Sequence, residues 1–185
     1  MAIWQYNISI IPKESVLQKH GEVPNKLIIN HEAWEKYWDN YTEGKEPNFE
    51  DAKTINWWKK TNISVTELSK DIDTIIPRAN WGSKSSINWK GNTENNEDND
   101  ASLIFNSVTN EIEEMTIRID LRDPDKFPQF LESLCSILKK RNLLLMDLKG
   151  NLMEPSVFKI SKHLLDSNAI KFLIDPEDFL NSLQK

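Results

Sequence analysis

The acidic side chains near the middle of the chain are the residues whose type and spacing most clearly point to a function. Residues 93 to 114 contain seven carboxylates and no Lys or Arg, whereas the whole protein of 185 residues has a formal charge of −6. Clustered like charge raises the local electrostatic potential and speeds encounter with an oppositely charged partner. We therefore expect a surface that binds a basic protein. It is formed by Glu94, Glu97, Asp98, Asp100, Glu111, Glu113 and Glu114.

Two other interpretations of this acidic segment (residues 93–114) stay open. The run from Glu94 to Asp100 has the composition of a cation site, but it lacks the alternating oxygen ligands, central Gly and terminal Glu of a helix-loop-helix calcium loop. A solvated hairpin loop would have the same composition. Glu111, Glu113 and Glu114 extend the patch only if the ends of neighbouring strands bring them beside the run.

The tryptophans are the second set of candidate binding residues, and all seven lie in the first half of the chain. An exposed ion pair contributes about 0 to 1 kcal/mol, whereas a desolvated Trp contributes about 2 kcal/mol or more to binding. We predict that Trp58 or Trp81 is the aromatic anchor beside the acidic segment. Trp57 and Trp58 are adjacent and cannot both point inward on a regular strand, so one of them should be exposed. The spacing places three others in the core: Trp34, Trp38 and Trp89.

No catalytic constellation is present in the sequence. His20, His31 and His163 stand alone, and five scattered Gly residues cannot form a phosphate-binding loop. Cys135 is the only Cys and follows Leu131 at helical spacing, so we expect a buried thiol and no Cys-based metal site. We predict no catalytic residue, no metal and no cofactor. The alternative function is a small enzyme or ligand-binding domain with a Trp-lined pocket in the N-terminal half.

The pattern of apolar residues indicates the strands and helices that must position these side chains, and together they predict an α+β fold. Alternating apolar residues indicate strands at 4–10, 86–90, 102–108 and 112–121, and the last three in succession form an antiparallel meander. Helix 126–141 has apolar residues at spacings of three and four and leads into the apolar run 143–148. Because a parallel return needs a crossover of a dozen or more residues, we predict that 143–148 is a further parallel strand, with helices packed on one face.

Capping signals predict the remaining helices. Asn30 is a suitable N-cap for a helix over about 31–42 with an aromatic face. Glu154-Pro155 and Asp175-Pro176 each place an acid before a Pro at the first helical position, so two more helices follow. Residues 171–174, between them, fit a short edge strand or a packed link.

Length and composition limit the class of protein. With 38% apolar and 28% charged residues, the chain should form a single globular domain, with a Trp-rich part over 1–82 and the meander and helices over 83–185. No apolar run approaches the roughly 20 residues that span a bilayer, and the start lacks a signal peptide, so we expect a cytoplasmic protein without a membrane partner. Its negative charge argues against binding to nucleic acid. No feature indicates an oligomeric state.

Segments over most of the chain resemble a group of small uncharacterised bacterial proteins. The segments that carry this resemblance are Trp4 to Pro12, Trp89-Lys90-Gly91 to Asp98-Asn99-Asp100-Ala101, Ile119-Asp120-Leu121-Arg122, Leu144-Leu145-Met146-Asp147, Gly150, Ser167-Asn168-Ala169, Lys171-Phe172-Leu173 and Asp175-Pro176. The acidic, Trp-rich, single-domain build also resembles bacterial immunity proteins, which neutralise partner toxins. This second resemblance implies a basic toxin as the partner, and it carries over no catalytic residue.

Overall fold

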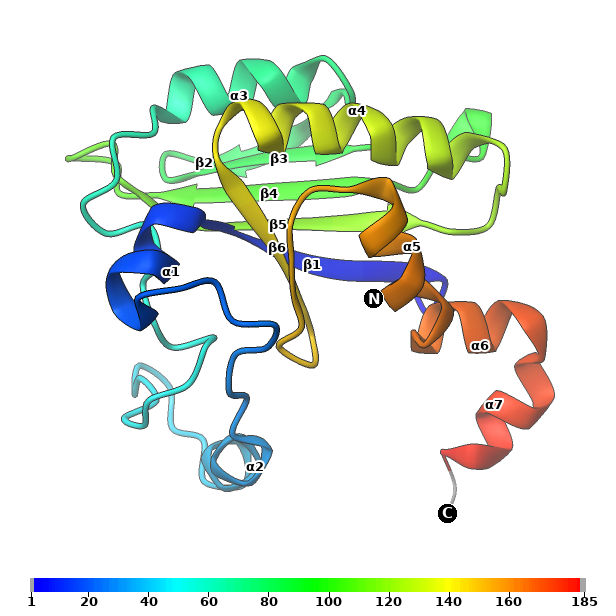
Figure 1. Ribbon diagram of the computed structural model, residues 1–185, viewed down its shortest axis with the longest axis horizontal. Coiled ribbons are helices and arrows are strands. Elements are labelled where there is room, and N and C mark those ends of the chain that lie inside the picture. Colours follow the sequence, from blue (N-terminus) through cyan, green and yellow to red (C-terminus); the bar gives the residue numbers. More distant parts are fainter. Residues whose placement is uncertain (1, 184–185) are drawn as a thin grey trace.

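The computed structural model describes residues 2–183 and contains one antiparallel sheet with helices on it (Figure 1). The strands lie in the order β2-β3-β4-β5-β1-β6-β7. Their bounds are β1 (Gln5–Pro12), β2 (Arg78–Ser83), β3 (Ser86–Lys90), β4 (Asp100–Phe105), β5 (Ile112–Asp120), β6 (Leu143–Asp147) and β7 (Leu152–Met153). The predicted α+β class is confirmed.

The predicted meander is present as β3, β4 and β5, each antiparallel to the next. The helical crossover is also present, because α4 (Lys126–Lys140) joins β5 to β6. β1 pairs antiparallel with both of these strands, through Ile8 opposite Ile117 and Ile10 opposite Leu145. β5 and β6 therefore run in the same direction, as predicted, but the N-terminal strand lies between them.

The other helices are short, and two of the predicted caps, Asn30 and Asp175, are confirmed. The cap predicted at Glu154-Pro155 is wrong, because the helix there begins at Val157, after Ser156. The side chain of Asn30 accepts a hydrogen bond from the amide of Ala33 at 3.0 Å, and that of Asp175 accepts one from Asp178 at 2.9 Å. Residues 171–174 are helical rather than a strand, because Ser167 caps the helix that contains them. The bounds are α1 (Lys13–His20), α2 (His31–Asp39), α3 (Val65–Asp73), α5 (Val157–Leu165), α6 (Asn168–Ile174) and α7 (Pro176–Ser182).

The helices α3 and α4 cover one face of the sheet and pack on it (Figure 1), and the core extends from there to residues of α1, α5 and α6 and of the segment 52–58. Period-two alternation puts Ile8, Leu103 and Ile117 on this face, and all three are buried. Cys135 is buried on α4, and burial raises the pKa of its thiol to about 11. The expected burial of this thiol is confirmed. No helix within residues 2–183 is long and apolar enough to cross a membrane.

Candidate functional site

The face of the sheet away from α3 and α4 has a polar floor that crosses four strands. Because alternate residues point to opposite faces, the strands that bury apolar residues on one side present polar residues on the other. Register partners on β1, β5, β4 and β3 form one row of small polar side chains across this face. The row consists of Ser9, Thr116, Ser102 and Asn88.

The neighbouring row, two residues farther along each strand, is charged and consists of Asn7, Arg118, Asp100 and Lys90. Arg118 Nη2 lies 2.7 Å from one carboxylate oxygen of Asp100, and Lys90 Nζ lies 2.7 Å from the other. Asp100 is only 3% exposed. Although burial opposes it, hydrogen bonds and charge from Asp100 and Asp98 raise the pKa of Lys90 above its ordinary value. This end of the polar face is therefore internally neutralised.

A β-bulge places two carboxylates at the opposite end of the same face. Ile104 pairs with Glu114, but the next residue of β4, Phe105, pairs with Ile112, so Glu113 is an extra residue in β5. Ile112 and Met115 are both buried, and the two residues between them are both exposed. Bulges re-aim side chains in this way. Within residues 2–183, neither Glu113 nor Glu114 has an ion-pair partner.

The walls of the site come from β2 and from the segment 51–61. Trp57 Nε1 donates to the carbonyl of Ala52 at 2.7 Å, and Trp58 Nε1 donates to the carbonyl of Ile10 in β1 at 3.1 Å. The first bond closes the segment on itself and the second fastens it to the sheet, with Lys53 exposed on it. Trp81 lines the other side from β2.

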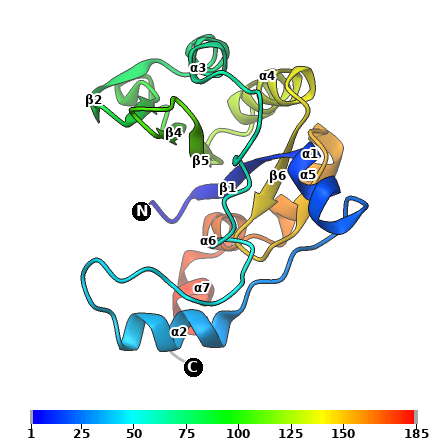
Figure 2. The same ribbon diagram turned by 90° about the vertical axis from the view of Figure 1, so that its left-hand side faces the viewer.

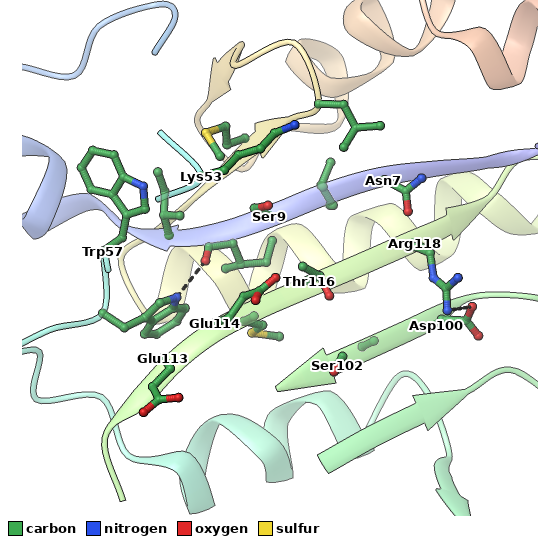
Figure 3. Close-up of a pocket in the computed structure, with 18 of the residues that line it drawn as sticks. Asn7, Ser9, Lys53, Trp57, Asp100, Ser102, Glu113, Glu114, Thr116 and Arg118 are labelled. Atoms are coloured by element: carbon green, nitrogen blue, oxygen red, sulfur yellow. Dashed lines mark hydrogen bonds and ion pairs between the residues drawn. The ribbon is translucent and has the colours of Figure 1, made fainter. Parts of the chain in front are cut away.

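Floor and walls enclose a groove of about 570 Å³ (Figure 3). Figure 3 shows Glu113 and Glu114 projecting from one end of β5, with the Arg118–Asp100 ion pair farther along the same strands. Of the nine predicted binding residues, five line this groove: Trp58, Trp81, Asp100, Glu113 and Glu114.

The predicted continuous acidic patch is wrong in two respects, and the first is pairing. Besides the ion pairs of Asp100, Asp98 accepts from Lys90 and from Trp4 Nε1, and Glu97 lies 3.7 Å from Lys126 Nζ. These cations lie outside the acidic segment in sequence but beside it in space. Of the four acids of the run, Glu94 alone is exposed and without an ion pair in the part of the chain that the structure describes.

The second error concerns the position of Glu111, Glu113 and Glu114. They follow β4, whereas Glu94 to Asp98 precede it, so the two groups lie at opposite ends of that strand. Six residues of strand separate them by roughly 17 Å. The prediction failed because β4 and β5 are antiparallel: the start of β5 lies beside the end of β4, and not beside its start, where the run from Glu94 to Asp98 lies.

The tryptophan predictions have a mixed outcome. Trp89 is buried as expected, and Trp81 is 56% exposed at the groove. Trp57 and Trp58 are both buried, because they lie in a turn and not in a strand. Trp58 therefore lines the groove but cannot serve as an exposed anchor. Trp34 and Trp38 were expected in the core, but α2, which carries both, has no buried residue, and Trp38 is 61% exposed.

Sequence reasoning missed the polar floor and Lys53. The signal was present, because Asn7 and Ser9 alternate with buried Ile8, and Thr116 and Arg118 alternate with buried Ile117. Such polar positions look like an ordinary solvated face until neighbouring strands are aligned.

The chemistry that this groove supports is recognition of a polar, cationic group. Hydroxyl and amide side chains offer hydrogen bonds, the Glu113–Glu114 pair offers negative charge, and Trp81 offers an aromatic surface. Within residues 2–183 no cluster of three or more His, Cys, Asp or Glu side chains could hold a metal ion. Comparisons with protein-family models, curated proteins and solved structures gave no match, so they neither support nor contradict the resemblances drawn from the sequence.

Proposed function

We propose that this protein is a protein-binding protein that holds a basic segment of its partner in the groove. The observation that carries this proposal is the bulge, which directs Glu113 and Glu114 to the same face, where neither forms an ion pair within residues 2–183. Two uncompensated carboxylates at the end of a hydrogen-bonding floor fit a Lys or Arg side chain.

The partner segment would lie across the row formed by Ser9, Thr116 and Ser102. Its main-chain amides and carbonyls can bond to those hydroxyls, and an aliphatic or cationic side chain can pack on Trp81. The paired charges of Asp100 and Arg118 close the other end, so the segment has a preferred direction. An acidic protein with this function fits the immunity-like class, acting in the cytoplasm on a basic toxin.

The proposal is tested with short synthetic peptides that contain Lys or Arg, compared with the same peptides after acetylation of Lys. Acetylation removes the charge and nearly preserves the shape. In two-dimensional NMR, the charged peptides should shift the amide signals of Ser102, Glu114 and Thr116, and the acetylated peptides should shift them much less. Equal shifts for both sets, or shifts confined to residues outside the groove, would refute the proposal.

A double variant identifies the carboxylates responsible. Glu113→Gln with Glu114→Gln should weaken binding by about tenfold, corresponding to about 1.4 kcal/mol for two partly exposed charges. The matched control is Glu94→Gln with Glu111→Gln, which removes the same charge outside the groove and should leave affinity nearly unchanged at moderate salt.

Binding of a small cationic ligand is the second candidate function, and one observation favours it. The groove volume of about 570 Å³ lies within the range typical of small-molecule sites. A screen of amine-containing fragments distinguishes the two functions. Fragments that saturate the groove more tightly than any peptide would favour the ligand-binding domain.

A further inference from the structure

The segment formed by residues 30–50, called here the arm, leaves the body of the protein and returns to the same place. Ala52 N donates to the carbonyl of Ile28 at 3.0 Å, and Asn30 N donates to Asp51 Oδ2 at 2.5 Å. These two bonds close the base of the arm. α2 lies in it at a distance from the helix-covered face (Figures 1 and 2).

One face of the arm is a ladder of aromatic rings. The ring centroids of Trp34 and Trp38 lie 6.2 Å apart, and those of Trp38 and Tyr41 lie 5.5 Å apart. Tyr37 and Phe49 pack edge-on against Trp34. In the described chain these five rings contact one another and form no part of the main core.

The outer rings of this ladder are available to a partner. Trp38 is 61% exposed and Tyr41 is 52% exposed. Exposed Trp and Tyr on a helix, with their neighbours already packed, match the residue types that dominate binding energy at protein interfaces.

The charge of the arm indicates what can cover this face. The arm has six carboxylates and two Lys, a formal charge of −4. Glu32 is paired with Lys36, and Glu50 is paired with Lys19. Within residues 2–183 the other four have no ion pair, and they are Glu35, Asp39, Glu43 and Glu46. This charge disfavours an anionic membrane, a nucleic acid and a second copy of the same chain, because each of these would add negative charge.

We propose that the arm is a second docking surface, which binds a cationic protein surface that carries an apolar patch. Trp38 and Tyr41 supply the apolar contact, and the four unpaired carboxylates of the same arm complement the partner's charge. This surface does not include the groove, so it can act whether or not the groove binds a partner.

A synthetic amphipathic helix of Leu and Lys serves as the probe, with the corresponding Leu–Glu peptide for comparison. Binding of the labelled peptides to the full-length protein is measured by fluorescence anisotropy at low and at high salt. The Leu–Lys peptide should bind, and the Leu–Glu peptide should bind at least about tenfold more weakly. Equal binding of both peptides would overturn the charge argument.

Two variants assign the contact to the arm. Trp38→Ala with Tyr41→Ala should weaken Leu–Lys binding by about tenfold or more, as expected for hot-spot aromatics. Replacement of Glu35, Asp39, Glu43 and Glu46 by their amides should reduce both the affinity and its salt dependence.

The control is Glu94→Gln with Glu111→Gln, which removes two charges outside both the arm and the groove and should bind the Leu–Lys peptide as the unmodified protein does. The groove variant Glu113→Gln with Glu114→Gln measures the share of this probe that binds in the groove. If only the groove variant loses binding, the arm is not a docking surface and the groove takes this probe as well. If anionic lipid vesicles shift the Trp fluorescence more than the Leu–Lys peptide does, the arm faces a membrane and the proposal is wrong.

Discussion

Deletion of Glu113 provides the sharpest test of how the groove is built. In the structure Glu113 is the extra residue of the bulge, between buried Ile112 and exposed Glu114. Removing it leaves Ile112, Glu114 and Met115 in regular alternation, so both apolar side chains keep their places in the core. We expect the free energy of unfolding to change by no more than about 1 kcal/mol, the size of an ordinary surface change.

The contrasting variant lacks Thr116, three residues along the same strand. This deletion shifts the preceding residues by one position, so Ile112 and Met115 move to the open face and Glu114 moves into the core. Ile112 and Met115 are 2% and 1% exposed, and losing the burial of both costs about 3 to 6 kcal/mol before the buried carboxylate is counted. Because domains have total stabilities of about 5 to 15 kcal/mol, this variant should be largely unfolded.

Urea denaturation followed by circular dichroism compares the two deletions with the unmodified protein. In addition, NMR contacts between backbone protons should retain the pairs Phe105–Ile112 and Ile104–Glu114 after deletion of Glu113. The reasoning fails if deletion of Glu113 destabilises the protein as much as deletion of Thr116. It also fails if Ile112 loses its pairing, because the loop and not the bulge would then have absorbed the change.

Three other predictions concern pH, packing and the arm. Although burial opposes it, hydrogen bonds and charge from Arg122 lower the pKa of Asp120. The stability that this carboxylate contributes is complete above the ordinary carboxyl pKa of about 4 and is lost as pH falls through the lower pKa of the folded state. Asp120→Asn should therefore flatten the acid side of a plot of Tm against pH. Trp58→Phe removes a buried hydrogen bond and should lower the free energy of unfolding by about 1 to 3 kcal/mol, whereas Trp81→Phe should change it by less than about 0.5 kcal/mol in the same urea titration. Replacement of residues 31–50 by a short Gly-Ser linker should shift Tm by less than about 4 °C in calorimetry, because the base of the arm is already closed and no residue of α2 is buried. A larger decrease in Tm would show that the arm supports the core.

Local periodicity in the sequence was sufficient for much of the fold. Alternation of apolar and polar residues located β1, β3 and β5, and spacings of three and four located α4 with Cys135 on its buried face. The capping roles of Asn30 and Asp175 were also predictable, because a cap involves only residues within one turn of the helix. Each of these features depends on neighbours in sequence, so it can be inferred without knowing the fold.

Which strands pair is determined only in the tertiary structure, and this pairing forms the groove. No local pattern shows that β1 lies between β5 and β6, because pairing partners are chosen by packing of whole strands. Only that pairing aligns Ser9 with Thr116 in one polar row and leaves the bulge carboxylates at its end.

The prediction for the acidic segment was wrong because it, too, depends on which residues the fold brings together. The sequence determined that residues 93–114 have a net charge of −7, but Lys90, Arg118 and Lys126 reach this segment through the fold and neutralise part of it. Spacing likewise predicted an aromatic face on α2, but not that this face would stay outside the core. Electrostatic interactions and burial both depend on distances in space, and positions along the chain do not determine those distances.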